Sequence, residues 1–400
     1  MGQNSEVSRL KGRARVRRRP LRLMLALGTR PEAIKIAPVV LAARNKRHIL
    51  LRLVSSGQHP RAMLEVLDHF AVPVDQDLAL FRNGQSLAHI LRTALGGFSS
   101  EIAAWRPDVV LVQGDTVSAL AAGLAAFYSA TPVAHVEAGL RSHNLAQPYP
   151  EEMNRLLVDT FAAFLFAPTL TAAANLATEG IAKARVFVTG NTVVDSLFAA
   201  LRDPRPVTDV GPVGAFIEPN GHRGRVLVTC HRRESWGKGL DAIATGLARA
   251  ARRFPDHIFL APLHPNPIVR RSFNGELPKN VLVGDPLPYS VFVKALSVSD
   301  LVVTDSGGIL EEATCLAKRV LVVRRRTERP EAVRSGQASV IGVDSNAVES
   351  AVSSYLAAPQ AATEIPAVCA FGDGRAGERI VDWLLWRFGL AETKPGPFDQ

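Results

Sequence analysis

The stretch Leu301-Val-Val-Thr-Asp-Ser-Gly-Gly-Ile-Leu-Glu-Glu312 predicts a short apolar strand, a turn with two glycines and the start of a helix. Gly307 and Gly308 have no Cβ, so the backbone there can come close to a ligand. The unpaired N–H groups of the following helix would face that ligand, with the positive end of the helix dipole behind them. A diphosphate fits such a place, and Glu312, one turn into the helix, suits an acceptor for sugar hydroxyls such as those of a ribose. An ordinary strand-to-helix turn is the alternative, and the rest of the chain bears on the choice.

The same strand–turn–helix pattern recurs along the chain. Apolar, β-rich runs are followed by Gly, Asn, Asp or Pro and then by a helical pattern, which predicts βαβ units and a parallel sheet. A stretch rich in proline and glycine interrupts the alternation, which then restarts. The expected fold class is therefore α/β, with two doubly wound, Rossmann-like domains that face a cleft. The runs are Leu21–Leu27, Val109–Val112, Val133–Val136, Val186–Val188, Val226–Thr229, Ile258–Ala261, Val281–Val283, Leu301–Thr304 and Val320–Val323.

This alternation also predicts the domain boundaries. We expect an N-terminal domain at residues 21–203, a linker at 204–224 and a C-terminal domain at 225–375. Residues 376–400 are expected to form a helix that crosses back to the N-terminal domain, followed by a tail. Ligands of doubly wound sheets bind at the carboxyl ends of the strands, so the polar segments found there are the candidate site.

The composition is that of a globular protein. The chain has 400 residues, of which 47% are hydrophobic and 21% charged, enough for two or three domains with their own cores. Cys230, Cys315 and Cys369 are far apart and have no paired metal spacing, which predicts a reducing compartment and no disulfide framework. No apolar run is long enough to span a bilayer, and we expect a cytoplasmic protein without a membrane partner.

The net charge of +10 comes mostly from one segment. Residues 9–22 contain many basic residues and no acid, and they lack the apolar core of a secretory signal. We interpret residues 1–20 as a disordered, solvated arm. Nucleic-acid binding is the weaker interpretation, because no aromatic residues are interleaved. The mild basic excess elsewhere suits an anionic substrate.

Two basic residues follow the first strand, in Gly28-Thr-Arg-Pro-Glu-Ala-Ile-Lys35. Pro31 is placed to begin a helix, and Arg30 and Lys35 lie about one turn apart near its start. Their charge opposes the helix dipole there. They indicate either an anionic partner or a solvated surface.

Carboxylates gather at the ends of later strands. Asp115 and Glu137 each come shortly after an apolar run, so we expect them, partly buried, at the mouths of adjacent strands. Glu151 and Glu152 follow Pro150, where an acid can instead serve as a helix-dipole partner; this alternative is stronger for Glu152. Clustered carboxylates raise one another's pKa, which lets one donate a proton while another accepts one.

Candidates in the second half lie at strand ends as well. His231 follows the first strand and could be an acid, a base or a phosphate contact, although an isolated histidine is more often structural. His264, in His264-Pro-Asn-Pro267, is interpreted as mainly structural or interdomain. Arg329, in Thr327-Glu-Arg-Pro-Glu331, is well placed to form a fork with a carboxylate or phosphate.

Taken together, these motifs resemble those of the non-hydrolysing UDP-N-acetylglucosamine 2-epimerases. The matches run in family order over about residues 21–390 and make the resemblance specific. The matching stretches are Gly28–Lys35, Gly57-Gln-His59, Gly114-Asp-Thr116, His135-Val-Glu-Ala-Gly-Leu-Arg141, Pro150-Glu-Glu-Met-Asn-Arg155, Gly190-Asn-Thr192, His231-Arg-Arg-Glu234, His264–Pro267, Asp305-Ser-Gly-Gly308, Thr327–Glu331 and Phe371-Gly-Asp-Gly374.

The resemblance implies a fold of the glycosyltransferase-B type with UDP in the cleft, a homodimer, and no nicotinamide or metal cofactor. It also implies that the enzyme inverts C2 of the sugar. UDP is eliminated across C1–C2 to give a 2-acetamidoglucal, and UDP then adds back with the C2 proton on the other face. A base must remove the C2 proton, and cations and N–H groups must stabilise the departing diphosphate.

The resemblance further implies roles for residues of this chain. Asp115, Glu137 and Glu151 would form the acid/base group with His231 beside them, and which carboxylate removes the C2 proton stays open. Phe292 would form part of the uracil pocket, together with the backbone at Leu287. The implied UDP-sugar contacts are Arg30, Lys35, Ser306, Gly307, Gly308, Glu312 and Arg329.

The chain departs from the family in two places that bear on function. Some members are activated by a second substrate molecule with the help of an Arg-Gln pair, but here Gly84 precedes Gln85, so we expect weaker activation. Arg324-Arg-Arg326 adds positive charge near the cleft and permits an altered sugar specificity. The implied residues of a second, allosteric site are Gln58, His59, Gln85, Arg232 and His264.

Three other functions stay open at this stage. A hydrolysing epimerase would release UDP and free N-acetylmannosamine. A glycosyltransferase that uses a UDP-sugar would need an acceptor. A non-catalytic nucleotide-sugar sensor would not need three clustered acids. The pathway served is not indicated by the sequence.

Overall fold

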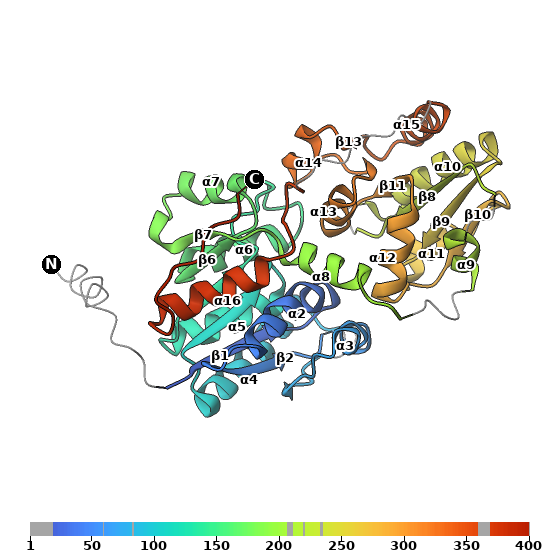
Figure 1. The fold of residues 1–400 in the computed structure, drawn as a ribbon. Coiled ribbons are helices and arrows are strands. Elements are labelled where there is room, and N and C mark those ends of the chain that lie inside the picture. Colours follow the sequence, from blue (N-terminus) through green and yellow to red (C-terminus); the bar gives the residue numbers. More distant parts are fainter. Residues whose placement is uncertain are drawn as a thin grey trace.

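The computed structural model describes residues 19–58, 60–81, 84–205, 211–218, 221–232, 235–358 and 369–399. Of the predicted basic arm, only residues 19 and 20 belong to this set, and the rest of the arm lies outside the described residues. No helix among the described residues is long and apolar enough to cross a membrane. The chain forms two lobes, each built around one parallel sheet (Figure 1).

The N-terminal sheet has seven strands in the order β3-β2-β1-β4-β5-β6-β7. The chain begins in the middle of this sheet and winds toward both edges, which is the doubly wound arrangement. Its strands are β1 (Leu21–Leu27), β2 (Ile49–Ser55), β3 (Gln76–Asp77), β4 (Val109–Gln113), β5 (Val133–Val136), β6 (Phe164–Ala167) and β7 (Val186–Val188). Its helices are α2 (Arg30–Arg44), α3 (Pro60–His69), α4 (Leu87–Trp105), α5 (Val117–Tyr128), α6 (Glu151–Phe161), α7 (Leu170–Thr178) and α8 (Thr192–Leu201).

The C-terminal sheet repeats the plan with six strands in the order β10-β9-β8-β11-β12-β13. Its strands are β8 (Gly224–Thr229), β9 (His257–Pro262), β10 (Val281–Gly284), β11 (Leu301–Thr304), β12 (Arg319–Val322) and β13 (Ala338–Val340). The helices that follow α8 are α9 (Pro212–Ile217), α10 (Lys238–Arg253), α11 (Pro267–Ser272), α12 (Tyr289–Val298), α13 (Gly307–Cys315), α14 (Pro330–Arg334), α15 (Ser345–Ala357) and α16 (Ala376–Arg387). The predicted pair of doubly wound parallel sheets is confirmed.

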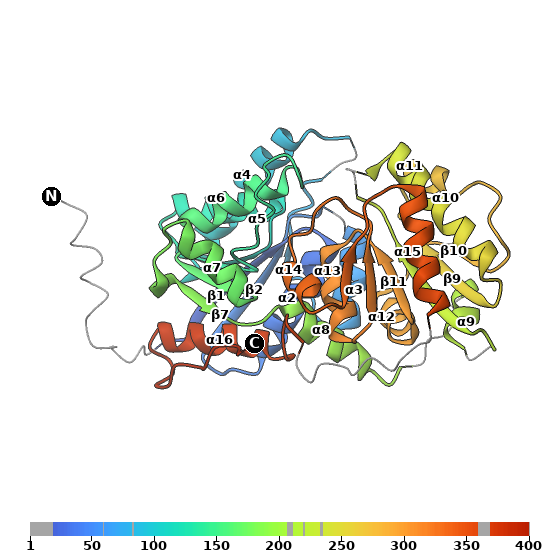
Figure 2. The ribbon, with the colours of Figure 1, turned by 90° about the horizontal axis from the view of Figure 1, so that it is seen from above.

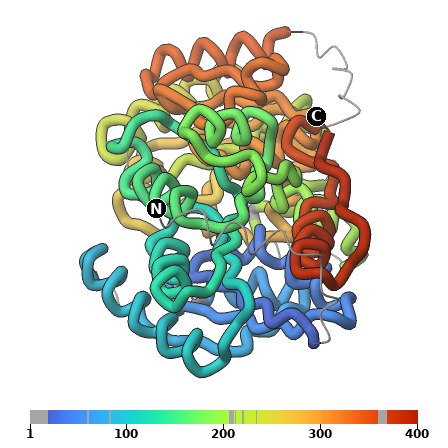
Figure 3. The backbone as a smooth tube through the Cα atoms, turned by 90° about the vertical axis from the view of Figure 1, so that its left-hand side faces the viewer, coloured from blue at the N-terminus to red at the C-terminus, as the bar shows by residue number. Residues whose placement is uncertain are grey.

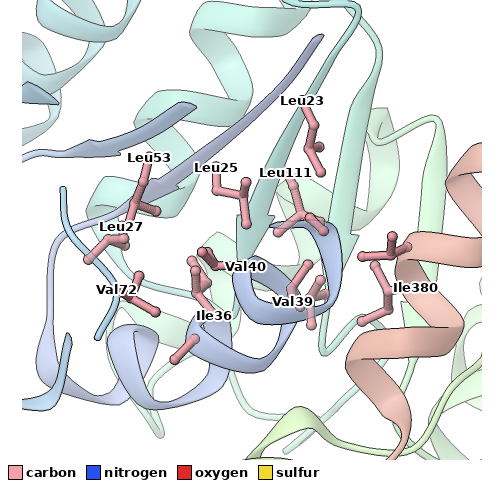
Figure 4. Packing of buried hydrophobic residues seen from close by; sticks show 14 of the residues in the cluster. Leu23, Leu25, Leu27, Ile36, Val39, Val40, Leu53, Val72, Leu111 and Ile380 are labelled. Carbon is pink, nitrogen blue, oxygen red and sulfur yellow. The ribbon is translucent and has the colours of Figure 1, made fainter. Parts of the chain in front are cut away.

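Burial on both faces of the sheets explains why most strands read as continuous apolar runs. All five residues of β4 are buried, and the core of the first lobe joins β1 and β4 to α2 and α16. Figure 4 shows Leu23, Leu25 and Leu27 of β1 facing Ile36, Val39 and Val40 of α2, with Ile380 of α16 at the edge of the same cluster.

Strands β2, β3, β6 and β13 were not among the predicted runs, and β3 and β13 have only two and three residues. Strand β2 is leucine-rich and contains Arg52, which pairs with Glu101 at 2.6 Å, so its composition does not favour a strand. Strand β6 follows α6 after only two residues, and its apolar residues merge with the end of that helix in the sequence. Turn residues do follow both strands, Ser56-Gly57 after β2 and Pro168 after β6, so the local signal was present and was overlooked.

The C-terminal segment lies against the first lobe. Helix α16 packs on α2 and α8, and Figures 1 and 3 show it, in red, beside the blue and green elements. Asp195 of α8 anchors its start, because the Asp195 carboxylate accepts hydrogen bonds from the backbone N–H groups of Ala376 (3.1 Å) and Gly377 (2.8 Å). A Cβ on Gly377 would lie 2.8 Å from the carbonyl oxygen of Pro38, so only glycine permits this approach.

The segment predicted to be a linker contains helix α9, which packs on β9, β10 and α12 of the second lobe. Figure 2 shows α9 beside this lobe from above. The domain boundaries themselves stay predictions.

The prediction of no disulfide is wrong. Cys315, the last residue of α13, and Cys369 form a disulfide that closes a separation of 54 residues, while Cys230 is buried and unpaired. No local pattern indicates this pair, because its two cysteines meet only after α14, β13 and α15 have folded between them.

We predict that this disulfide stabilises the protein measurably. A cross-link closing a loop of this length removes conformational entropy worth about 4 kcal/mol from the unfolded chain. Cys315→Ser should therefore lower the thermal midpoint without reductant, and dithiothreitol should lower the wild type to the same value. Cys230→Ser is the control, because it should keep its response to dithiothreitol. A wild-type midpoint that does not respond to reductant would contradict the prediction.

Candidate active site

Side chains from both lobes meet where the carboxyl ends of the two sheets face each other. Lys35 of α2 contacts Glu137 after β5, and Arg329, before α14 in the other lobe, contacts the same carboxylate. Arg30 of α2 also reaches across and donates to the carbonyl of Leu287 at 2.7 Å. The structure therefore brings four predicted candidates into one region: Arg30, Lys35, Glu137 and Arg329. This region lies at the carboxyl ends of the strands, where doubly wound sheets bind their ligands.

Four side chains donate to the buried carboxylate of Glu137. Lys35 Nζ lies 2.6 Å from both Glu137 oxygens. Asn191 Nδ2 donates to Oε1 at 3.1 Å, Arg329 donates to Oε1 at 3.2 Å, and Gln113 Nε2 donates to Oε2. Glu137 has φ of 69°, a left-handed conformation that is uncommon outside glycine and marks backbone held by its surroundings.

The charge state of Glu137 follows from these partners. Burial alone would raise the pKa of this carboxyl, but the positive charges of Lys35 and Arg329 outweigh it and lower the pKa to about 2. The carboxylate is therefore ionised throughout the physiological range.

Glu311 is a second buried carboxylate in the same network, and the sequence analysis missed it. Its oxygens accept from Arg329 Nε at 2.7 Å and from Asn191 Nδ2 at 2.7 Å. Burial, followed by the nearby charge of Glu137, raises the pKa of Glu311 against the opposing effect of Arg329. A signal was present: Gly307, Glu311 and Thr314 share one helical face, and a charged residue on a buried face needs a partner.

Arg329 is surrounded by acids. In addition to Glu137 and Glu311 it pairs with Glu328 at 3.0 Å, and these charges raise its pKa despite full burial. Glu328 also pairs with Arg324 at 2.6 Å and Arg232 at 3.3 Å. Burial opposes ionisation of Glu328, but Arg329 and the other cations hold its pKa well below the ordinary value.

The start of α13 offers backbone donors. Ser306 is its N-cap residue and makes no side-chain cap, so the first N–H groups of the helix are available to an anion. A Cβ on Gly308 would meet nothing within 4 Å. A Cβ on Gly307 would lie 3.0 Å from both Arg329 Cζ and Glu328 Oε1. The two glycines thus differ in purpose, since Gly308 opens the helix start and Gly307 makes room for ion pairs.

Glu312, the next residue of α13, points about 100° away from Glu311 around the helix and lies next to a buried tyrosine. Tyr289 donates from its hydroxyl to Glu312 Oε1 at 2.8 Å. Burial raises the pKa of Glu312 to about 7, assisted by the charge of Glu311 and opposed by the Tyr289 hydrogen bond. Phe292 of α12 is buried in the adjoining core cluster. Tyr289 was not predicted as a site residue, because an aromatic residue on an apolar helix normally indicates core.

Asp115 and Glu152 both pair with a buried arginine, Arg155. Asp115 follows β4, keeps 27% of its side chain exposed, and pairs with Arg155 of α6. Arg155 also pairs with Glu152 at 2.9 Å, whose other oxygen accepts from the backbone of Ser142. Glu152 is therefore structural, as expected. Glu151 is the half-buried first residue of α6, directly before this linked set.

His231 lies at the end of β8 with its side chain 42% exposed. Its ring stacks on that of His264 with centroids 5.8 Å apart, and its backbone N–H donates to the buried carboxylate of Asp305 at 2.8 Å. His264 follows β9 of the same lobe, so this stacking lies within one lobe, and its structural or interdomain role stays a prediction.

The residues implied in a second site are spread along this edge. Gln58 accepts from Ser118 at 3.0 Å, and Arg232 is paired with Glu328. Gln85 follows Gly84, whose missing Cβ would meet nothing within 4 Å. His59 lies outside the described residues. Within the described chain no group of His, Cys, Asp or Glu is arranged to hold a metal.

Comparisons with known proteins agree with this geometry. The family model for UDP-N-acetylglucosamine 2-epimerase matches residues 41–385. The chain belongs to this family. Curated members with the same name from Yersinia pestis and Escherichia coli K12 are each 40% identical, over 371 and 374 residues, and cover 91% of this chain and 98% of the relative. Membership makes the chain an isomerase, as predicted.

Solved structures extend the family match to the fold. The Neisseria meningitidis epimerase bound to UDP-GlcNAc is 36% identical with a TM-score of 0.85, covering 92% of this chain and 100% of that one. The Methanocaldococcus jannaschii epimerase in complex with UDP-GlcNAc and UDP is 31% identical with a TM-score of 0.79 and the same coverage. A glycotransferase of kitacinnamycin, 15% identical with a TM-score of 0.59 over 92% of this chain and all of that one, shows the fold alone. The predicted glycosyltransferase-B type is confirmed.

We predict a pH-dependent stability contribution from Glu312. Its pKa of about 7 exceeds the ordinary 4.5, so the folded protein holds this proton more tightly than the unfolded chain. The resulting stability is present below the ordinary pKa and is lost as the pH rises to about 7, by on the order of 3 kcal/mol. Glu312→Gln, which still accepts from Tyr289, should match the wild type at about pH 5 and exceed its unfolding free energy at about pH 8.

Urea unfolding at the two pH values measures this difference. Glu378→Gln is the control, because Glu378 is exposed on α16 and pairs only loosely with Arg375 at 3.1 Å. An equal stability difference at both pH values would show that Glu312 does not titrate in this range.

Proposed function

We propose that this protein interconverts UDP-N-acetylglucosamine and UDP-N-acetylmannosamine by eliminating UDP across C1–C2 and adding it back. Two kinds of support apply. The family relatives carry the epimerase name, and two of the similar structures contain UDP-GlcNAc. The candidate site combines an anion-binding helix start with clustered carboxylates, which this reaction requires.

Binding of the nucleotide is assigned to the second lobe and α2. The diphosphate would lie at Ser306, Gly307 and Gly308, within reach of Arg30 and Lys35. The ribose would donate to Glu312, and the uracil would lie near Phe292 and the backbone of Leu287. As the C1–O bond breaks, negative charge builds on the diphosphate, and fixed N–H groups and cations stabilise it.

Proton transfer is assigned to Asp115, Glu137 and Glu151, with His231 beside them. The C2–H bond loses its proton to a carboxylate, its electron pair forms the C1=C2 bond, and UDP leaves with the C1–O pair. A carboxylate with a pKa of about 2, as Glu137 has without ligand, is a weak base. We infer that an arriving diphosphate competes for Lys35 and Arg329 and so raises the basicity of Glu137 only when substrate is bound.

The ionised Glu137 carboxylate, held by cations of both lobes beside the start of α13, is the observation that carries this proposal. A buried anion at that place repels the diphosphate, so its presence favours a role in proton transfer over UDP binding alone.

We further propose a cytoplasmic homodimer. The support for a dimer is an exposed apolar face on α5 and α6, which pack together and present Phe127, Tyr128, Met153 and Leu157. Such faces on soluble domains commonly mark protein contacts. The bacterial epimerase relatives support the compartment.

The first functional prediction concerns the C2 hydrogen. Incubation with UDP-N-acetylglucosamine in deuterated water, without added metal or nicotinamide, should give both epimers with deuterium at C2, measured by NMR. Retention of the original C2 hydrogen during turnover would contradict elimination. Accumulation of UDP with free N-acetylmannosamine would indicate a hydrolysing enzyme, and no reaction without an acceptor would favour a glycosyltransferase.

The second functional prediction concerns the carboxylates. Asp115→Asn, Glu137→Gln and Glu151→Gln should each lower turnover by roughly a hundredfold or more, the scale of general acid–base catalysis. Calorimetric titration should show that UDP binding persists. Glu101→Gln makes the same change in an ion pair outside the site, with Arg52, and should turn over normally. Near-normal rates in all three site variants would exclude the assignment.

A further inference from the structure

A separate cavity of about 460 Å³ opens between the two lobes. It is lined by the loop after β5, which includes Ser142, by the start of α10, by the loop after β12, and by the residues just before α15. Glu328 and Arg324 also belong to the ion-pair network of the site described above, and Arg325 and Arg326 are basic residues that depart from the family pattern. A cavity of this volume is in the range of small-molecule sites, about 300–1,000 Å³.

The two acids that line the cavity, Glu328 and Asp344, already have hydrogen-bond or ion-pair partners. Glu328 is paired with Arg232, Arg324 and Arg329. Asp344 caps α15, because its Oδ1 accepts from the backbone N–H groups of Asn346 and Ala347, each at 3.0 Å. The charge of Glu328 is thus balanced by its arginines, and Asp344 is the one lining acid among the described residues whose charge is not paired with a cation.

Three of the cations that line the cavity have no such partner among the described residues. Arg325, Arg326 and Lys238 are exposed, and none of them makes an ion pair or a side-chain hydrogen bond with another residue that the structure describes. Their charges converge from two elements, the loop after β12 and the start of α10. Like charges gathered around a concave surface raise the local potential and favour an anion.

Backbone N–H groups at the start of α10 also favour an anion in the cavity. Lys238 and Gly239, the first two residues of α10, line the cavity. The N-cap residue of α10 is Gly237, which supplies no side-chain cap. The first-turn N–H groups of this 16-residue helix are therefore open to a ligand, with the positive end of the helix dipole behind them.

The cavity is distinct from the proposed nucleotide site but adjacent to it. Arg30, Leu287, Phe292, Gly308 and Glu312 do not line it. Glu328 forms the shared wall, since it lines the cavity and its Oε1 also lies 3.0 Å from the position of a Cβ on Gly307. One layer of ion-paired side chains thus separates the cavity from the start of α13.

We propose that this cavity is a second ligand site, which binds the phosphate or carboxylate of a sugar. Guanidinium groups bind both anions in a bidentate fork, and a lone ion would leave most of the cavity unfilled. The anionic sugar has two conceivable sources: a separate small molecule, or an acidic sugar at the end of a nucleotide-sugar substrate. The shared chemistry is the anionic group held by Arg325, Arg326 and Lys238.

Calorimetric titration of the full chain tests this assignment without requiring turnover. N-acetylglucosamine 6-phosphate and N-acetylglucosaminuronate are the probes, and neutral N-acetylglucosamine is the blank. The wild type should bind at least one anionic probe saturably and the blank not at all. The double variant Arg325→Gln/Arg326→Gln should weaken that binding by roughly tenfold or more, the loss expected from removing charge-assisted contacts.

The matched control is Arg252→Gln/Arg253→Gln, which removes the same charge from the opposite end of α10 and should bind like the wild type. UDP titration should be equal in all three proteins, which separates this site from the proposed epimerase function. Titration with UDP-N-acetylglucosaminuronate then distinguishes the sources. If the double variant weakens binding of this nucleotide sugar but not of UDP, the cavity takes the acidic end of a substrate, whereas equal binding by the double variant and the wild type indicates a separate ligand. Absence of saturable binding, or binding that the double variant does not weaken, overturns the proposal.

Discussion

The buried Glu137 carboxylate is the constraint on which the arrangement of the two lobes depends. An anion removed from water is costly unless cations and hydrogen bonds replace the lost hydration. Its partners come from four places: Lys35 on α2, Gln113 at the end of β4, Asn191 before α8 and Arg329 before α14. Removing one partner of such a buried ion pair typically costs about 3–5 kcal/mol. Three of the partners belong to the same lobe as Glu137, so the two lobes must meet in a position that brings Arg329 to it.

This constraint also prepares the site for an anionic substrate. Lys35 and Arg329 are buried cations, and without substrate they would lack a counter-charge if Glu137 and Glu311 were absent. The acids therefore keep the cations in place before a ligand arrives, so little reorganisation is needed when charge develops. The same acids repel a negatively charged ligand unless the ligand takes over some of their contacts with Lys35 and Arg329. A diphosphate has two or more oxygens able to make such contacts and is therefore favoured.

The sequence analysis succeeded where structure follows from local pattern. Strands β1 and β11 have the predicted bounds, Leu21–Leu27 and Leu301–Thr304, because parallel strands buried on both faces read as continuous apolar runs. Asp115 and Glu137 were found because parallel strands present their ends at one edge. Strands β2 and β6 were missed although turn residues follow each of them, because the arginine in β2 interrupts its apolar run and β6 merges with the apolar end of α6.

Partners distant in the chain could not be predicted in this way. Arg329 and Glu137 are 192 residues apart, and Glu311 joins them through Asn191, another 120 residues away from it. The disulfide between Cys315 and Cys369 is of the same kind, because only the packing of intervening elements brings the cysteines together. Periodicity shows that a charged residue faces inward, but the identity of its partner is a property of the tertiary structure.

Gly307 links the candidate diphosphate site to the buried ion pairs. Its missing Cβ leaves space for the Arg329 guanidinium and for Glu328 directly beneath the start of α13. Arg329 is thus close to any anion held by the N–H groups of that helix, and it pairs with Glu137, Glu311 and Glu328 at the same time. Since these interactions take place in a buried, weakly screened region, charge placed at the helix start acts on Glu137 through Arg329. The glycine motif that first indicated a diphosphate site is therefore also the feature that couples this site to the acid/base group.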